Sequence, residues 1–160
     1  MKTIRLANIE LNDMNNGDGI CISVWLQGCP HHCLECHNPE TWSFDGGKIY
    51  YQEQVISEIL ESINKNNILR NLSLLGGEPL CPENREFSLK LAAAVKEKFP
   101  KVIVYCWTGY TLEELDTQWL ENIDILIDGK YEKDLRDITL YLRGSSNQRV
   151  LRKGIDFLKK

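Results

Sequence analysis

Residues 20–27 read ICISVWLQ, and residues 28–39, which follow directly, read GCPHHCLECHNP. The first run is an almost continuous series of apolar, β-branched and aromatic residues, which is typical of a strand covered on both faces. The second run concentrates cysteine and histidine where that strand ends. In folds that alternate strands and helices, ligands bind beyond the carboxyl ends of the strands. The stretch therefore predicts a buried strand with a binding site at its end.

The rest of the chain alternates strand-like and helix-like segments. Residues 102–106, VIVYC, repeat the pattern of a buried strand, whereas residues 51–64 place apolar side chains on one helical face. Thr111 and Glu114 have the spacing of a capping box, which predicts the start of a further helix. Strands are expected at residues 20–27, 71–75, 102–106, 123–127 and 138–142, and helices at 51–64, 83–99 and 111–120.

Length and composition indicate the architecture. The chain has 160 residues, 42% of them hydrophobic, with no internal repeat, low-complexity tract or flexible linker. We therefore expect one domain over residues 1–160. Alternating strands and helices indicate the α/β class with a parallel sheet. Because a complete eight-unit barrel takes about 250 residues, the chain is expected to form an incomplete, TIM-like β/α barrel of parallel strands or a short open sheet.

The charge pattern argues against several classes of protein. A net charge of −4 disfavours a dedicated nucleic-acid-binding protein, which would carry a strongly basic face. The sequence contains neither an apolar run of about 18 residues nor a secretion leader, so we expect a cytoplasmic protein without a membrane span. Residues 143–160 nevertheless carry +5, which leaves −9 for residues 1–142. This basic end is either an ordinary solvated segment or a docking surface for an acidic partner.

Six cysteines in a reducing compartment are expected to bind metal, to act as redox thiols or to pack in the core. Three of them form a C-x3-C-x2-C cluster, Cys29, Cys33 and Cys36, and three are dispersed, Cys21, Cys81 and Cys106. Soft sulfur ligands from one tight loop suit an iron-sulfur cluster. Because an ordinary four-iron cluster uses four cysteines, this loop would leave one iron open to an external ligand.

Other uses of the cysteine loop stay open at this point. His31, His32 and His37 all lie in the loop, so a Cys3His zinc site can be drawn, although the spacing differs from that of structural zinc sites. A disulfide relay lacks a thioredoxin-like context. Cys81 or Cys106 could close the cluster and make the protein an electron carrier, or both could be buried core residues.

Glycine-containing motifs follow three further expected strands, at Gly76-Gly77-Glu78, Thr108-Gly109 and Asp128-Gly129-Lys130. Because the carboxyl ends of parallel strands meet at one edge, we expect these motifs and the cysteine loop to share one rim. The glycine pair indicates either a close approach of the backbone to a ligand or an ordinary turn. Asp128 alone predicts no cation site, and it could equally form a salt bridge with Lys130.

The cysteine loop resembles that of the radical S-adenosylmethionine (SAM) enzymes, whose signature is C-x3-C-x2-C after the first strand. Residues 24–42, 76–80, 107–115, 124–137 and 142–150 are similar to the branch that activates the anaerobic ribonucleoside-triphosphate reductase. The resemblance implies an incomplete barrel of the radical SAM type. It also implies reductive cleavage of SAM to methionine and a 5′-deoxyadenosyl radical, which would take a hydrogen from a glycine Cα of the large reductase subunit.

The resemblance also implies roles for individual residues. Each of the three clustered cysteines would bind one iron of a [4Fe-4S] cluster, and the fourth iron would be open to SAM. The motif Gly76-Gly77-Glu78 would contact the ammonium group of SAM, and the residues that flank the third cysteine would hold the adenine. The full set of implied SAM-binding residues is Glu35, Cys36, His37, Gly76, Gly77, Glu78, Thr108 and Asp128.

The implied partners are the reductase, as protein substrate, and a flavodoxin-type electron donor, with a homodimer or a heterotetramer with the reductase left open. The polar loop at residues 143–149 and the basic end are interpreted as part of the rim or of the docking face. Reversing the charges of Arg149 and Arg152 is therefore expected to weaken activation of the reductase and to spare SAM cleavage. The alternatives are an activase of another glycyl-radical enzyme, such as pyruvate formate-lyase, and a non-catalytic zinc or iron-sulfur protein.

Overall fold

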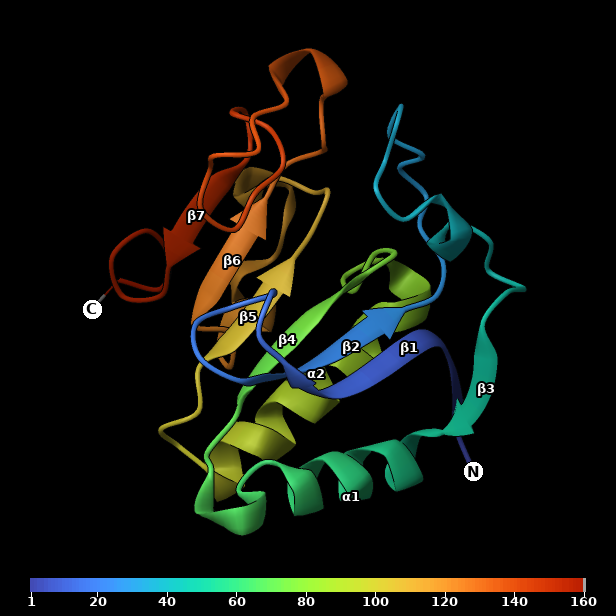
Figure 1. Ribbon diagram of the computed structural model, residues 1–160, viewed down its shortest axis with the longest axis vertical. Helices are drawn as coiled ribbons and strands as arrows, with labels where there is room; N and C mark the ends of the chain where they lie inside the picture. Colours follow the sequence, from blue (N-terminus) through green and yellow to red (C-terminus); the bar gives the residue numbers. More distant parts are fainter. Residues whose placement is uncertain (160) are drawn as a thin grey trace.

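The computed structural model describes residues 1–159, which form one seven-stranded sheet with two α-helices (Figure 1). The strands are β1 (Thr3–Asp13), β2 (Cys21–Leu26), β3 (Lys48–Tyr51), β4 (Asn71–Gly76), β5 (Val104–Trp107), β6 (Ile125–Asp128) and β7 (Arg149–Arg152). The helices are α1 (Gln52–Ser62) and α2 (Pro82–Lys98). The short 3-10 helices are η1 (Pro39–Thr41), η2 (Lys65–Asn67), η3 (Leu112–Glu114), η4 (Thr117–Leu120) and η5 (Lys133–Leu135). Lys160, counted above in the basic end, lies outside the described residues.

The sheet is parallel at its centre and antiparallel at its sides. Its strand order is β3-β1-β2-β4-β5-β6-β7, and the pairs β2–β4, β4–β5 and β5–β6 are parallel. The strands β1, β3 and β7 pair antiparallel with their neighbours. Parallel neighbours need a crossover of about a dozen residues or more, whereas residues 14–20 alone join β1 to β2. The α/β class is thus confirmed, and the expectation of parallel strands throughout is wrong for the outer strands.

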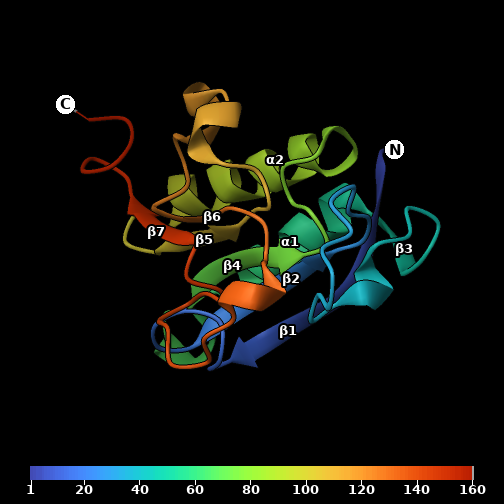
Figure 2. The ribbon, with the colours of Figure 1, turned by 90° about the horizontal axis from the view of Figure 1, so that it is seen from above.

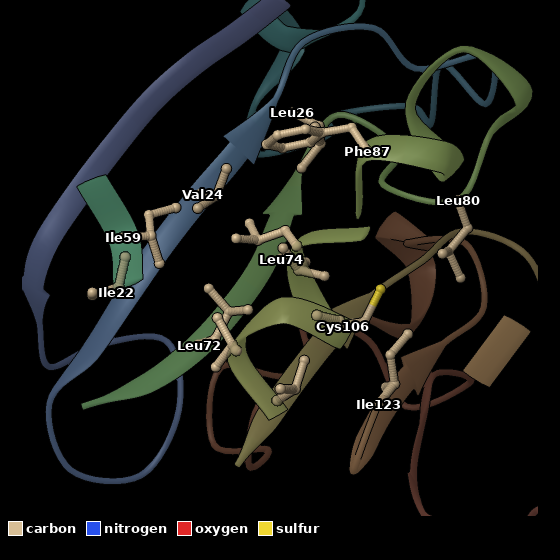
Figure 3. Packing of buried hydrophobic residues seen from close by; sticks show 14 of the residues in the cluster. Ile22, Val24, Leu26, Ile59, Leu72, Leu74, Leu80, Phe87, Cys106 and Ile123 are labelled. Carbon is tan, nitrogen blue, oxygen red and sulfur yellow. The ribbon is translucent and has the colours of Figure 1, made fainter. Parts of the chain in front are cut away.

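Both α-helices cover the same face of the sheet (Figure 2). Side chains alternate between the faces of a strand, so Ile22, Val24 and Leu26 of β2 all point toward the helices. They pack in one cluster with Ile59 of α1 and Phe87 of α2, and each of these side chains is at most 1% exposed (Figure 3). Burial of this apolar surface fixes β2, and with it the position where the cysteine loop starts.

Loops cover the opposite face of the sheet. Tyr105 of β5 and Ile127 of β6 form a second hydrophobic cluster there. The segment between β1 and β2 packs against this cluster, because the backbone N–H of Asp18 donates to Tyr105 Oη at 3.1 Å. Trp107 Nε1 donates to the carbonyl oxygen of Leu142 at 2.7 Å, which brings the loop before β7 to the same face. This face therefore lies beneath two loops, whereas the α-helices of residues 1–159 cover the other face (Figure 2).

Most expected elements are present, with bounds that differ by a few residues at some ends, but two expectations are wrong. Residues 138–142 form turns and not a strand, and Ile138 is 84% exposed because no neighbouring strand or helix covers it. Residues 111–120 contain η3 and η4 in place of one helix, although the capping box of Thr111 and Glu114 is present. The strands β1, β3 and β7 were not expected from the sequence. No helix in the described part of the chain has the length and hydrophobicity that a membrane span requires.

Candidate functional site

A cavity of about 420 Å³ lies where β4, β5 and β6 end and the cysteine loop begins. Eight of the ten predicted site residues line it: Cys29, Cys33, Cys36, His37, Gly76, Gly77, Glu78 and Thr108. Glu35 and Asp128 are not in its wall. The expectation that motifs from separate strands share one rim is therefore confirmed for β2, β4 and β5, and Gly129 brings the end of β6 to the same cavity.

The cysteine loop folds as two tight turns. Cys36 N–H donates to the carbonyl oxygen of Cys33 at 3.1 Å, and Asn38 N–H donates to Cys36 Sγ at 3.4 Å. Glu35 adopts the left-handed region with φ +56°, which reverses the chain between the second and third cysteines. Its side chain leaves the loop and forms an ion pair with Lys133 at 3.5 Å. As a result of these turns, all three cysteines line one cavity, and the Glu35 carboxylate lies outside it.

Burial affects two of the three clustered thiols. Burial raises the pKa of the Cys29 thiol to about 11 and also raises the pKa of Cys33. Coordination by a metal deprotonates a thiol outright, so these groups would ionise on binding a cluster. Among residues 1–159, no group of three His, Cys, Asp or Glu side chains is placed so that it could hold a metal ion. Three thiols on one cavity wall are a donor set that suits an iron-sulfur cluster.

The histidines of the loop have other contacts. His31 Nε2 lies 2.7 Å from Glu78 Oε1. The ring of His32 stacks on Trp42 with centroids 4.8 Å apart, and the ring of His37 lies 4.9 Å from that of Tyr131. The Cys3His zinc alternative gains no support, because no group of three His, Cys, Asp or Glu side chains in the part of the chain that the structure describes is placed to hold a metal ion.

The dispersed cysteines are core residues. Cys106 of β5 is fully buried on the helix-covered face of the sheet, and Cys81 precedes α2 and donates to the carbonyl oxygen of Glu78 at 3.2 Å. Cys21 is fully buried at the start of β2. Burial raises the pKa of Cys81 to about 12. None of the three lines the cavity as described over residues 1–159, so the alternative in which Cys81 or Cys106 closes the cluster gains no support.

Glu78 is the most connected polar group of the site. Its side chain is buried, and its Oε2 accepts hydrogen bonds from Leu80 N–H at 2.9 Å and from Thr108 Oγ1 at 2.8 Å. Its Oε1 accepts from Gly109 N–H at 2.7 Å and is the atom that His31 contacts. The carboxylate therefore joins the ends of β4 and β5 to the cysteine loop.

Crowding within the chain explains the glycine pair after β4. A Cβ on Gly76 would lie 2.6 Å from the backbone nitrogen of Leu26, and Gly76 has φ +121°. A Cβ on Gly77 would lie 2.4 Å from the carbonyl oxygen of Gly28. Glu78 N–H also donates to that carbonyl at 2.8 Å. From the sequence, a close approach to a ligand and an ordinary turn were both open. The structure shows that these glycines approach the backbone that leads into the cysteine loop.

Asp128 has a structural partner other than the one considered from sequence. Arg149 Nε donates to Asp128 Oδ1 at 3.0 Å and Arg149 Nη2 to Asp128 Oδ2 at 2.5 Å, while Leu112 N–H donates to Oδ2 at 2.8 Å. Arg149 also pairs with Glu113, and these two carboxylates raise its pKa. The alternative of a salt bridge between Asp128 and Lys130 is therefore wrong. Arg149 instead forms ion pairs with two carboxylates of the same chain.

Several residues of the cavity wall were not expected from the sequence. They are contributed by the loop after β1 and by the segments before and after η5: Asn15, Asn16, Tyr131 and Leu142. Arg143 and Gln148, which also line the cavity, belong to the polar loop at residues 143–149, which carried a usable signal because it was interpreted as part of the rim or of the docking face. Asn15 and Asn16 gave no such signal, because their position depends on how the β1–β2 connection folds over the sheet.

Comparison with known proteins gives two results. A family model described as a 4Fe-4S single cluster domain matches residues 15–151. The anaerobic ribonucleoside-triphosphate reductase-activating protein of Pasteurella multocida is 39% identical over 146 residues, which are 88% of this chain and 92% of that protein. Proteins of the same name from Haemophilus influenzae and Escherichia coli are 38% and 37% identical, and the alignments cover 88% and 86% of this chain and 92% of each relative.

The chain belongs to the family of anaerobic ribonucleoside-triphosphate reductase-activating proteins. The region that matches the 4Fe-4S domain model includes every residue that lines the cavity, from Asn15 to Gln148.

Proposed function

We propose that this protein is a radical SAM enzyme that binds a [4Fe-4S] cluster and installs a glycyl radical on the anaerobic ribonucleoside-triphosphate reductase. One observation carries the proposal: Cys29, Cys33 and Cys36 line a single cavity, with no fourth cysteine of the described chain in its wall. A cluster held by three thiolates keeps one iron open for an external ligand. Family membership and the 4Fe-4S domain match support the same conclusion.

The bound cluster would supply one electron to SAM, which splits into methionine and a 5′-deoxyadenosyl radical that takes a hydrogen atom from a glycine Cα. The protein's contribution is to hold SAM so that its sulfonium lies beside the cluster. The backbone at Gly76 and Gly77 would receive the ammonium group, and His37 would flank the adenine. Thr108 would act through its hydrogen bond to Glu78. Glu35 and Asp128, which lie outside the cavity wall, receive no direct contact with SAM in this proposal.

The open sheet is consistent with a protein as substrate. Its edges are β3 and β7, and we propose that it is an incomplete β/α barrel of the radical SAM type. A barrel left open on one side admits a segment of the reductase to the cavity. A flavodoxin-type protein would donate the electron, in the reducing environment of the cytoplasm, where thiols stay free to bind iron.

An anaerobic reconstitution tests this function. The protein is loaded with iron and sulfide, reduced with dithionite and mixed with SAM, and 5′-deoxyadenosine is quantified. We expect product from the wild type and from Cys106→Ala, whose thiol lies outside the cavity wall, and a loss of product in Cys33→Ala. Adding either the reductase or pyruvate formate-lyase, followed by electron paramagnetic resonance (EPR), identifies the protein that receives the radical. A colourless zinc protein, or a brown protein inert toward SAM, would contradict the proposal.

A further inference from the structure

The cysteine loop is tied to the strand ends by one buried side chain. His31 stands midway between Cys29 and Cys33, and its Nε2 lies 2.7 Å from Glu78 Oε1. The side chains of His31 and Glu78 are 6% and 1% exposed. A carboxylate has no proton to give, so the imidazole is the donor of this hydrogen bond. A charge-assisted bond shielded from water is among the stronger hydrogen bonds in proteins.

Three other hydrogen bonds hold the Glu78 carboxylate in place. Leu80 N–H, Thr108 Oγ1 and Gly109 N–H already hold both carboxylate oxygens in place. The acceptor that His31 meets is therefore held by residues that follow β4 and β5, independently of the cysteine loop. The hydrogen bond from His31 joins the loop to this acceptor.

The position of the His31 ring is also determined by packing against neighbouring residues. A Cβ on Gly109 would lie 2.4 Å from the ring, so only glycine leaves room for the imidazole at that position. The Tyr110 ring meets it edge-on, with centroids 4.6 Å apart and planes at 76°. The adjacent His32 differs, because it is exposed and only stacks on Trp42. The His31 ring therefore occupies a closely packed position, and the exposed His32 in the same loop can serve as a control.

We propose that His31 is a positioning residue that anchors the cluster-binding loop to Glu78, so that the cysteines are preorganised for the iron-sulfur cluster. The proposal rests on the proposed function in that the loop is taken to hold the cluster. Groups behind the ligands of metal sites orient those ligands, and their loss typically weakens metal binding about 10- to 100-fold. In this protein the orienting group reaches the cysteines through the backbone of their loop, two residues from Cys29 and two from Cys33.

Three variants test this role. His31→Leu removes the hydrogen bond and keeps an apolar side chain of similar size against Tyr110, His31→Gln restores a donor, and His32→Leu is the matched control. The first measurement is hydrogen exchange of the backbone amides of residues 29–36 in the metal-free protein. The second is the rate at which a chelator removes iron from the reconstituted protein, together with the EPR spectrum of the reduced cluster.

We expect His31→Leu to exchange loop amides faster, to lose iron about 10-fold faster and to broaden the EPR spectrum, while His32→Leu behaves as the wild type. His31→Gln should recover most of each effect, which a general loss of packing would not permit. Loop exchange and iron loss unchanged in His31→Leu would overturn the inference. A wild-type protein that takes up no cluster, while its loop exchange still depends on His31, would contradict the proposed function and support the anchoring role.

Discussion

The contact between Gly109 and His31 provides a quantitative test of how the rim is assembled. In Gly109→Ala the new Cβ would lie 2.4 Å from Cδ2 and 2.7 Å from Nε2 of His31, so the imidazole has to move. Its hydrogen bond to Glu78 would be lost, and a bond to a charged group contributes about 1.5–3 kcal/mol. Gly109 has no positive φ, so alanine itself is tolerated and stabilises by about 0.4–1 kcal/mol through the unfolded chain. The free energy of unfolding should therefore fall by about 1–2 kcal/mol.

A double-mutant cycle on the metal-free protein measures this effect by urea unfolding. In a His31→Ala background the clash is absent, so Gly109→Ala should become neutral or slightly stabilising. Gly77→Ala is the matched control, because its Cβ would meet the backbone carbonyl oxygen of Gly28 at 2.4 Å whether or not His31 is present. An equal cost of Gly109→Ala in both backgrounds would refute the reasoning, since the cost would then not arise at His31.

Three further outcomes are expected. Burial raises the pKa of the Cys81 thiol from about 9 to about 12, so between these pH values the folded state keeps a proton that the unfolded chain loses. The free energy of unfolding of the metal-free protein, measured with urea, should therefore fall as the pH rises through this interval. This fall should be steeper in the wild type than in Cys81→Ala, by up to about 1.4 kcal/mol per pH unit. Arg149→Met should cost about 2–3 kcal/mol, less than the 3–5 typical of fully buried pairs because Arg149 is partly exposed, since it leaves the buried Asp128 without its cation; a thermal unfolding midpoint equal to the wild type would exclude this role. Arg152→Glu, at an exposed position of the basic end, should weaken activation of the reductase and leave 5′-deoxyadenosine formation unchanged, and equal activation by both proteins would rule out docking through this end.

Changing Arg152 alone is a cleaner test than reversing the charges of both Arg149 and Arg152. Arg149 lies in the ion pairs with Asp128 and Glu113, so reversing its charge would disturb the end of β6 as well as any docking surface. Arg152 has an exposed side chain, and its backbone N–H donates to Asp156. A change at Arg152 alone therefore separates docking from folding.

The centre of the fold was predictable because its signals are local. The run ICISVWLQ is apolar enough to indicate a buried strand, and β2 occupies residues 21–26 of it. The rule that parallel strands share a carboxyl edge then placed the GGE motif, Thr108 and the cysteines together, as the cavity confirms. The outer strands gave weaker signals, since β1 buries few of its residues after Leu6. The segment at residues 138–142 misled for the opposite reason: its pattern is apolar, although Ile138 is 84% and Tyr141 46% exposed.

The partners of the charged groups could not be predicted from sequence, because they depend on register and on distant contacts. Asp128 faces Arg149 only because β7 returns antiparallel beside β6, with these two residues as register partners. Glu78 and His31 are 47 residues apart and meet only after β2 and β4 pair. Spacing along the chain indicates which residues carry chemistry, whereas pairing across the sheet determines which of them touch.

The central claim is a [4Fe-4S] cluster on Cys29, Cys33 and Cys36 with one iron open to SAM. The most direct measurement is the EPR spectrum of the reconstituted, reduced protein recorded with and without SAM. The account predicts a [4Fe-4S] signal that shifts when SAM is added, and loss of that signal in Cys33→Ala. A cluster signal that is unchanged by SAM, or that persists in Cys33→Ala, would contradict the claim.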